Sequence, residues 1–398
     1  MKIIIVYDQY NRDFQSLSLL AKNLKKKNLD VFLIPKSYLI LFAYVLKPYC
    51  IIISNPDHHL GELSQLCSQN FKIYSIPTEQ FFFNKKDFLD RIVKGHHYGS
   101  STDFLDTNID SIDQFFLWSN THVRYCKNTK LSNKVTAIGS TKINRNKIKK
   151  KSKVKTIGFI IEEENPFNWI NFLHSNKHST WPFSPDIQLI HEVQTTFSQI
   201  KLLEILKKKK INIIIRIYWT DSVSDFKFMN SKNITIDNSK DTKNFFDKVD
   251  AVITSKSTMG FEAYLYNLPV ISVRNLYKYK VIDDFPSHPC SPKTIRKAVE
   301  TCLNLNKFKI NNIFKKKIQN FFGYELDPAR KIYEYILKTK NKPKSFKKIN
   351  RVKEQFILNR LKFSEKFIYK YSNNSLINFI FLIKIKLVLF IYKKKFFN

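Results

Sequence analysis

Glycine is scarce in this chain, since the 398 residues include only seven. None of them falls into a G-x-G-x-x-G or G-x-x-x-x-G-K pattern, the two loops whose backbone cradles phosphates in dinucleotide-binding enzymes and P-loop NTPases. The sequence therefore argues against both classes. Prolines number 13 and hydrophobic residues make up 43% of the chain, which indicates packed globular domains and not a disordered protein.

Features of exported proteins are missing as well. The five cysteines are odd in number and no two have C-x-x-C spacing, so neither a disulfide framework nor a zinc site is indicated. Near the N-terminus an apolar run is short and no small-residue cleavage site follows it, which favours a first strand over a signal peptide. We therefore expect a reducing, cytoplasmic setting. The cysteines are Cys50, Cys67, Cys126, Cys290 and Cys302.

Positive charge is abundant. The chain has 68 Lys and Arg against 33 Asp and Glu, a formal net charge of +35. Such an excess favours an anionic partner, which leaves open nucleic acid, an acidic lipid surface, or acidic sugars and nucleotides.

Short apolar runs alternate with amphipathic segments along residues 1–340. The runs have the length of buried strands, and the segments between them show a helical period. This alternation predicts an α/β fold of doubly wound parallel sheets. We expect strands at Lys2–Tyr7, Asp30–Pro35, Tyr49–Ser54, Phe71–Pro77, Phe115–Ser119, Lys134–Ile138, Thr156–Ile161, Ile211–Ile217, Asn233–Asp237, Asp250–Ile253 and Val270–Val273. We expect helices at Phe14–Lys27, Ile187–Lys207, Thr242–Phe246, Phe261–Tyr266, Thr294–Leu303 and Ile318–Leu337.

Changes in composition divide the chain into three parts. Asn144–Lys155 is rich in lysine and has no apolar period, which is typical of a linker. We therefore expect one α/β domain at residues 1–145 and a second at residues 153–340. Residues 341–398 form a basic, apolar tail.

The segment Lys248–Val273 organises the second domain. It contains a strand, a polar turn from Ser255 to Thr258, a short helix and a second strand. In open α/β sheets, ligands bind beyond the carboxyl ends of the strands, where such a turn lies. Its hydroxyl and backbone N–H groups suit an anion, and Glu262 suits the hydroxyls of a ribose or sugar. The plainer alternative is a βαβ turn whose Ser and Thr cap a helix and whose Glu is solvated.

Residues Ser257–Ala263 read S-T-M-G-F-E-A. They resemble the S-T-x-G-x-E-A element of bacterial surface-carbohydrate biosynthesis proteins, a group of GT-B glycosyltransferases that includes Kdo-type transferases. Weaker likenesses to the same group follow the chain in order. They are an acidic turn at Pro77–Gln80, a W-G step at Phe116–Ser119, a G-x-P-R-x-D element at Ile138–Asn144, an R-x-H-P-x-E element at Arg216–Asp221, and a closing D-x-x-A-x-R-I helix at Asp327–Ile332.

Several of these elements depart from the group's pattern. Ser119 replaces the Gly of the W-G step, Ser-Thr-Lys and Asn144 alter the G-x-P-R-x-D element, and Tyr218 and Trp219 replace His and Pro after Arg216. These changes keep open the alternative that the protein is a catalytically inactive scaffold. Arg216 in particular has two readings, a phosphate contact or a surface ion pair with Asp221.

The resemblance implies a GT-B-like fold, in which two Rossmann-like domains face a cleft. It implies a glycosyltransferase that moves a sugar from a nucleotide-activated donor to a surface polysaccharide, such as capsule or lipopolysaccharide, or to a lipid-linked glycan. A CMP-linked acidic sugar is one such donor. No cofactor and no metal are expected. The expected donor-binding residues are Arg216, Tyr218, Ser257, Thr258, Gly260 and Glu262.

A glycosyl transfer also needs a carboxylate as general base or nucleophile. In a two-domain transferase it comes from the N-terminal half, where Glu79 is the first candidate and Asp8 the second. Another polar cluster, Asp57–His59, suggests a metal site or, more simply, a polar loop.

Two other functions remain open. A CDP-glycerol-type polyol-phosphate transferase would need histidine motifs, for which His96, His97 and His288 are the candidates. A nucleic-acid-binding protein is suggested by charge alone, but no recognised module is present and the lysines are scattered. We therefore expect no nucleic-acid partner.

The tail carries the most apolar window of the chain, Leu376–Tyr392. Lys384 and Lys386 lie near its middle, which disfavours insertion into a bilayer, and flanking basic residues suit an anionic membrane surface. We expect a tail that binds peripherally to the inner face of the cell membrane. A transmembrane helix and ordinary packing on the domains are the alternatives.

Overall fold

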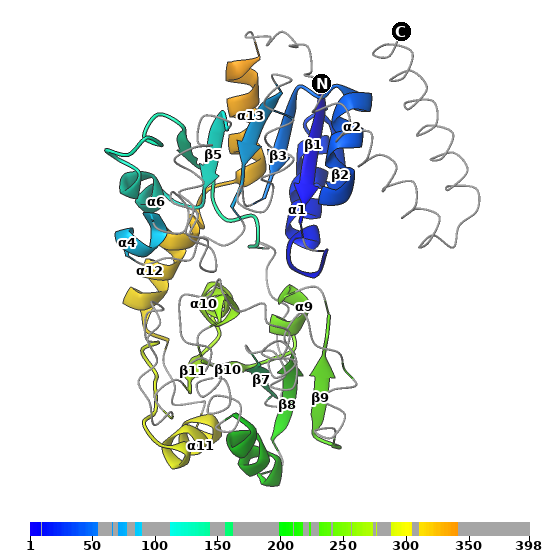
Figure 1. Ribbon diagram of the computed structural model, residues 1–398. Coiled ribbons are helices and arrows are strands. Elements are labelled where there is room, and N and C mark those ends of the chain that lie inside the picture. The colour runs from blue at the N-terminus through cyan, green and yellow to red at the C-terminus, as the bar shows by residue number, and fades with distance from the viewer. Residues whose placement is uncertain are drawn as a thin grey trace, which may run out of the picture.

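The chain folds into two α/β lobes, shown one above the other in Figure 1. The computed structural model describes residues 1–8, 10–54, 66, 71–77, 84–89, 112–143, 156–161, 199–209, 211–217, 223, 231–239, 242–255, 257–273, 276, 288–304 and 310–340. The tail at residues 341–398 lies outside these residues, as do Glu79, Tyr218, Asp57–His59, His96 and His97.

The first lobe is built on a six-stranded sheet in which every pairing is parallel, in the order β2-β1-β3-β4-β5-β6. From β1 the chain adds β2 on one side and β3 to β6 on the other, so the topological switch of this sheet lies between β1 and β3. The strands are β1 (Lys2–Tyr7), β2 (Asp30–Pro35), β3 (Cys50–Ile53), β4 (Lys72–Ser75), β5 (Gln114–Leu117) and β6 (Val135–Ala137). The helical elements are α1 (Tyr10–Lys25), the 3₁₀ turn η1 (Lys36–Tyr38), α2 (Leu39–Leu46), α4 (Lys85–Phe88) and α6 (Asn120–Tyr125).

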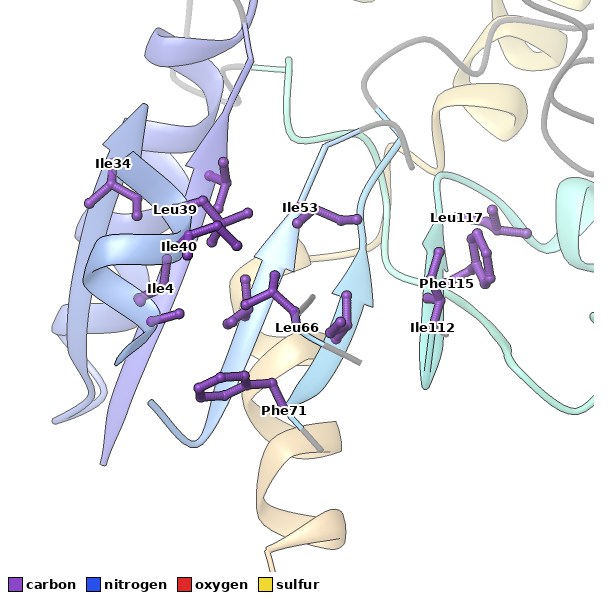
Figure 2. Packing of buried hydrophobic residues seen from close by; sticks show 14 of the residues in the cluster. Ile4, Ile34, Leu39, Ile40, Ile53, Leu66, Phe71, Ile112, Phe115 and Leu117 are labelled. Carbon is purple, nitrogen blue, oxygen red and sulfur yellow. The ribbon is translucent and has the colours of Figure 1, made fainter. Parts of the chain in front are cut away.

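Both faces of this sheet are buried, which explains why its strands read as nearly continuous apolar runs. Figure 2 shows one face, where Ile4 of β1, Ile53 of β3 and Phe115 of β5 pack with Leu39 and Ile40 of α2. The opposite face packs against α1 and against a helix from the far end of the described chain, α13 (Pro328–Thr339).

The second lobe is built on a five-stranded parallel sheet in the order β11-β10-β7-β8-β9. Here the direction of winding reverses between β7 and β10, which makes that point the topological switch of the sheet. The strands are β7 (Thr156–Ile160), β8 (Asn212–Arg216), β9 (Ile234–Asp237), β10 (Ala251–Thr254) and β11 (Val270–Ser272). The helices are α9 (Thr242–Phe246), α10 (Thr258–Leu265) and α11 (Ile295–Leu303), and residues 199–208 are also helical.

The predicted α/β fold with two doubly wound parallel sheets is confirmed, and every strand of both sheets lies within about two residues of a predicted one. The short helices α2, α4 and α6 were not predicted. In α2 seven of the eight residues are large and apolar or aromatic, so the segment has no polar face to reveal a helical period.

The predicted single helix Ile318–Leu337 is wrong, because the structure has two helices there. α12 (Asn312–Phe322) ends at Gly323, which has a left-handed φ of 58° and forms the C-cap. A new helix, α13, then begins after Asp327, whose carboxylate accepts a hydrogen bond from the backbone N–H of Arg330 at 3.1 Å. A glycine C-cap and an aspartate N-cap are ordinary helix ends, and the apolar period continues across them.

α13 returns the chain to the first lobe. Ala329, Ile332 and Ile336 pack on the first sheet. At the end of the helix, the buried Lys72 Nζ donates to the carbonyl oxygen of Thr339 at 2.8 Å and to Tyr49 Oη at 2.7 Å. A cation there complements the negative end of the helix dipole. The residues expected to form the second domain therefore include one helix that packs on the first lobe.

Between the lobes, α12 packs against α10 of the second lobe and α6 of the first. The described helices all fall short of the length and hydropathy needed to span a bilayer.

Candidate functional site

The candidate site lies at the switch point of the second sheet. α10 begins just after β10 ends, and Arg216 is the last residue of β8 on the other side of β7. The carboxyl ends of the strands in this lobe point toward the first lobe, and α10 lies on that side (Figure 1). Ligands of open α/β sheets bind at this position.

The turn before α10 is a helix cap. Ser257 is the N-cap residue, and its Oγ accepts a hydrogen bond from the N–H of Met259 at 3.1 Å. The cap uses a lone pair of the hydroxyl, so the O–H group can still donate to an anion. Thr258, the first residue of the helix, is half-buried. The capping role that the sequence offered as the plainer alternative is therefore real, and it is compatible with binding.

Gly260 has a packing role. A Cβ at this position would lie 2.6 Å from Cγ2 of Thr254, a separation that real side chains do not adopt. Glycine therefore lets the first turn of α10 approach the end of β10 closely. The residue was predicted as a donor-binding position, and the structure gives it this additional structural reason.

Glu262 is the most unusual residue of the site. It is only 4% exposed, so it is not the solvated glutamate of the plainer alternative. Burial raises the pKa of its carboxyl group from 4.5 to about 7, although the positive charges of Lys142 and Arg216 act in the opposite direction. These two cations come from different lobes, so Glu262 lies where the lobes meet.

Arg216 is held by an acidic partner on the neighbouring strand. Its Nη1 donates to Oδ2 of Asp237 at 2.6 Å and to Oγ of Ser239 at 3.1 Å. The Ser239 hydroxyl also donates to Oδ2 of Asp237 at 3.0 Å, and Asp237 is buried. This network fixes the orientation of the guanidinium group. Both hydrogen bonds come from Nη1, and a guanidinium group has five N–H donors in all. Asp221, the partner considered from sequence, lies outside the described residues.

Lys142 reaches the site from the loop that follows β6. That loop carries the altered G-x-P-R-x-D element, and its Ser140 Oγ accepts a hydrogen bond from the backbone N–H of Lys142 at 3.2 Å. Sequence analysis assigned no role to Lys142. Nothing in the sequence near it points to Glu262, and only the packing of the lobes brings the two charges together.

Asp237 was also missed as a site residue. A signal was available, because Asp237 ends the predicted strand Asn233–Asp237 and Arg216 lies next to the end of the preceding predicted strand, Ile211–Ile217. In the structure the two residues are paired in the β8–β9 register.

The candidate catalytic carboxylates belong to the first lobe. Asp8 follows β1, and one carboxylate oxygen lies 3.9 Å from Nζ of Lys36, which follows β2. The position is the switch point of the first sheet. Glu79, the first candidate, and Tyr218, a candidate donor contact, lie outside the described residues, so both remain predictions.

His288 is packed as core. It is 3% exposed, its ring stacks on Phe261 at a centroid distance of 4.3 Å, and its Nδ1 lies 3.3 Å from Oη of Tyr264. These contacts hold α10 in place. Among the residues with described positions, no cluster of His, Cys, Asp or Glu has three members close enough to hold a metal ion.

The site thus combines a buried carboxyl group, two cations and a helix N-terminus with a hydroxyl group. The cations and the helix N-terminus suit an anionic group such as a phosphate. The carboxyl group suits neighbouring hydroxyl groups, which it can bind in either protonation state.

No protein-family model matches the chain, and no curated protein matches it in sequence. Solved structures do match its fold. S. aureus MnaA in its UDP co-structure has a TM-score of 0.50 and 12% sequence identity over 87% of this chain and 100% of MnaA. The glycosyltransferase SnogD from Streptomyces nogalater has a TM-score of 0.50 and 6% identity over 85% of this chain and 100% of SnogD.

A Listeria monocytogenes protein assigned as a UDP-N-acetylglucosamine 2-epimerase has a TM-score of 0.50 and 10% identity, over 88% of this chain and 99% of that protein. At such identities the similarity concerns the fold. The two lobes of this chain therefore have the GT-B fold that glycosyltransferases and nucleotide-sugar epimerases share, and the fold expected from the resemblance is confirmed.

Proposed function

We propose that this protein is a glycosyltransferase that takes a sugar from a nucleotide-activated donor. The observation that carries the proposal is the buried Glu262 in the middle of α10, acted on by cations from both lobes. A buried carboxyl group costs free energy unless it is hydrogen-bonded or paired, and a ligand with hydroxyl and phosphate groups would bind both the carboxyl group and the cations.

In this proposal the donor phosphate lies at the N-terminus of α10. Arg216, oriented by Asp237, and the hydroxyl groups of Ser257 and Thr258 neutralise the charge that develops on the leaving phosphate. Glu262 binds hydroxyl groups of the ribose or sugar. Gly260 allows α10 to approach β10, and Tyr218 is a further donor contact.

The acceptor reacts from the side of the first lobe. Glu79, or failing that Asp8, removes the proton of the acceptor hydroxyl or attacks the anomeric carbon. Asp8 directly follows β1, and the carboxyl end of β1 points toward the second lobe in Figure 1, which supports its candidacy.

The finer assignment follows the sequence motifs. The acceptor is a growing surface polysaccharide or lipid-linked glycan, as in the surface-carbohydrate group that Ser257–Ala263 resembles. The donor nucleotide is UDP or CMP. UDP is bound by MnaA, which has the same fold, and CMP would carry the acidic sugar that the Kdo-type resemblance implies.

Nucleotide binding tests the proposal directly. UDP, CMP, CDP and GDP are titrated into the wild type by calorimetry, and at least one should bind. Glu262→Gln should weaken that binding by about tenfold or more, as expected for loss of a charged hydrogen-bonding group. The matched control is Glu300→Gln, an exposed glutamate of α11. Failure of all four nucleotides to bind contradicts the proposal.

Arg216 needs a paired design, because its removal alone leaves the buried Asp237 with only the exposed Lys248, whose Nζ lies 4.0 Å from Oδ1. The variant Arg216→Gln with Asp237→Asn removes both charges and should lose nucleotide affinity. Asp237→Asn alone should lose less, because the guanidinium remains. Turnover is then tested by incubating the wild type with the sugar form of the nucleotide that binds. Transfer to a glycan supports the transferase, epimerised sugar identifies an epimerase, and binding without turnover identifies an inactive scaffold.

The location at the inner face of the cell membrane is part of the same proposal. It rests on the sequence of residues 341–398, where an apolar window is flanked by basic residues. A lipid-linked acceptor lies at the same surface, so a basic tail would bring the site to its substrate.

A further inference from the structure

One loop of the first lobe is fixed against the connection between α12 and α13. We call this contact the interlobe joint and define it by Trp118, Gly139, Ser140, Phe322 and Gly323. The N–H of Ser140 donates to the carbonyl oxygen of Phe322 at 2.8 Å. The rings of Trp118 and Phe322 stack at a centroid distance of 5.2 Å. Every member of the joint is buried.

Two glycines make the joint possible. Gly139 has a φ of 90°, and a Cβ there would lie 2.8 Å from the carbonyl oxygens of Gly323 and Leu326. A Cβ on Gly323 would lie 1.9 Å from the carbonyl oxygen of Trp118. Two of the seven glycines of the chain lie in this contact. The backbone of the loop therefore lies in direct contact with the connection between α12 and α13.

Thr141 and Lys142 follow Ser140 directly in the same loop. Lys142 acts on Glu262 of the second lobe through its positive charge. Thr141 is only 5% exposed, and its hydroxyl has no hydrogen-bond partner among the described residues. A buried hydroxyl without a partner costs free energy unless a ligand or another part of the chain satisfies it.

We propose that Lys142 is a phosphate-binding residue of the donor site, supplied by the first lobe to complete the cations of the second, with Thr141 as a further hydrogen-bond donor. This inference rests on the proposed function. It accounts for the close packing of the loop, for the buried hydroxyl of Thr141, and for the lysine whose charge acts on Glu262 of α10. It also gives the altered G-x-P-R-x-D element a purpose, since Lys142 retains a positive charge within that loop.

The test compares Lys142→Ala with Lys142→Arg, using UDP, CMP and inorganic pyrophosphate as probes in calorimetry. We expect Lys142→Ala to weaken binding of these probes by about 10- to 100-fold, the loss typical of a charge-assisted contact. Lys142→Arg should restore most of the affinity because it keeps the charge. Lys127→Ala is the matched control, since Lys127 is an exposed lysine of the same lobe. Thr141→Val, which keeps the shape of the side chain, should weaken binding by a smaller factor.

A background of Glu262→Gln separates a direct contact from an indirect one. If Lys142 binds phosphate itself, Lys142→Ala still reduces the affinity for pyrophosphate in that background. If Lys142 only balances the charge of Glu262, its removal changes nothing there, and the inference is overturned. Circular dichroism of each variant establishes that it is folded.

The two proposals fail in different ways. A wild-type chain that binds none of UDP, CMP, CDP and GDP contradicts the proposed function, and this inference falls with it. A wild type that binds UDP, together with a Lys142→Ala variant that binds it as Lys127→Ala does, overturns the inference about Lys142 and leaves the proposed function intact.

Discussion

Glu262 illustrates how much one side chain depends on its surroundings. In sequence it is one of 33 acidic residues in a chain of net charge +35, and many lysines are available to neutralise it. In the structure burial outweighs the two cations that act on it, and its pKa rises to about 7. The carboxyl group therefore changes its charge near neutral pH, while an exposed glutamate does so near 4.5.

This shift predicts a pH dependence of stability. The folded state binds the proton more tightly than the unfolded state, so the contribution of Glu262 is fully present below pH 4.5 and is lost as the pH rises through about 7. The loss amounts to roughly 3 kcal/mol for a shift of this size. In Glu262→Gln the amide cannot ionise, so the free energy of unfolding should fall less between pH 5 and pH 8 than in the wild type.

Urea unfolding at several pH values measures this difference. Glu300→Gln, on the surface of α11, serves as the control and should follow the wild-type profile. Identical profiles for Glu262→Gln and the wild type would show that the carboxyl group is not buried in the way described.

Arg216 and Asp237 show a second effect at the scale of single residues. Each ends its own strand, and the parallel register places them opposite one another. The resulting buried pair fixes a guanidinium group at the carboxyl end of β8, the strand next to β7. The arginine belongs to a recognisable motif in the sequence. The aspartate does not, because an Asp at the end of a strand has many ordinary uses.

At the scale of elements, strands were easier to predict than helix ends. Buried parallel strands are almost entirely apolar, so short runs of apolar residues in the sequence predict their positions. The break between α12 and α13 was missed because its apolar period runs through Gly323. In the sequence the glycine looked like one residue within a helix. Only the structure shows its left-handed φ of 58° and its close approach to Trp118 and Gly139 of the first lobe.

The interlobe joint gives a prediction at this scale. Gly323→Ala places a Cβ 1.9 Å from the carbonyl oxygen of Trp118 and at a left-handed φ of 58°, so the joint must shift. We expect a loss of stability of about 2 kcal/mol or more, because both a steric clash and backbone strain are introduced. The midpoint of urea unfolding measures it.

The control for this change is Asn320→Ala, at an exposed position in the last turn of the same helix. It should leave the midpoint within about 0.5 kcal/mol of the wild type, as surface substitutions usually do. Gly139→Ala should be destabilising as well, and the double variant should lose less than the sum, because both glycines serve one contact. Additive losses would show that the two glycines act independently.

At the scale of the whole molecule, the net charge of +35 favours anionic partners of any kind. In our proposal the fold and the site narrow the class of anionic partner to nucleotide sugars. The composition of the tail predicts an anionic membrane as a second partner. The sequence placed the strongest membrane signal at Leu376–Tyr392. This segment lies outside the described residues, so the assignment remains a prediction.

Vesicle binding tests whether residues 341–398 bind an anionic membrane. The full chain should sediment with vesicles that contain about 30% phosphatidylserine, and 0.5 M salt should release most of it, because electrostatic attraction is screened over a few ångströms at such salt. Deletion of residues 341–398 should abolish the binding. The control is the same assay with neutral phosphatidylcholine vesicles. Equal binding of the deleted chain would mean that the basic lobes, and not the tail, bind the surface.

The sequence by itself determined the class of the fold, the place of each strand and the polar turn at Ser257, because these are set by local apolar runs and by residues close together in the chain. Only the tertiary structure decided which charges meet. Arg216 and Glu262 are brought together by the strand order of the second sheet. Lys142 joins them from the first lobe, where α12 packs against α6 as well as against α10. Burial, which raises the pKa of Glu262, is likewise a property of the packed molecule, and the residues next to Glu262 in the sequence do not predict it.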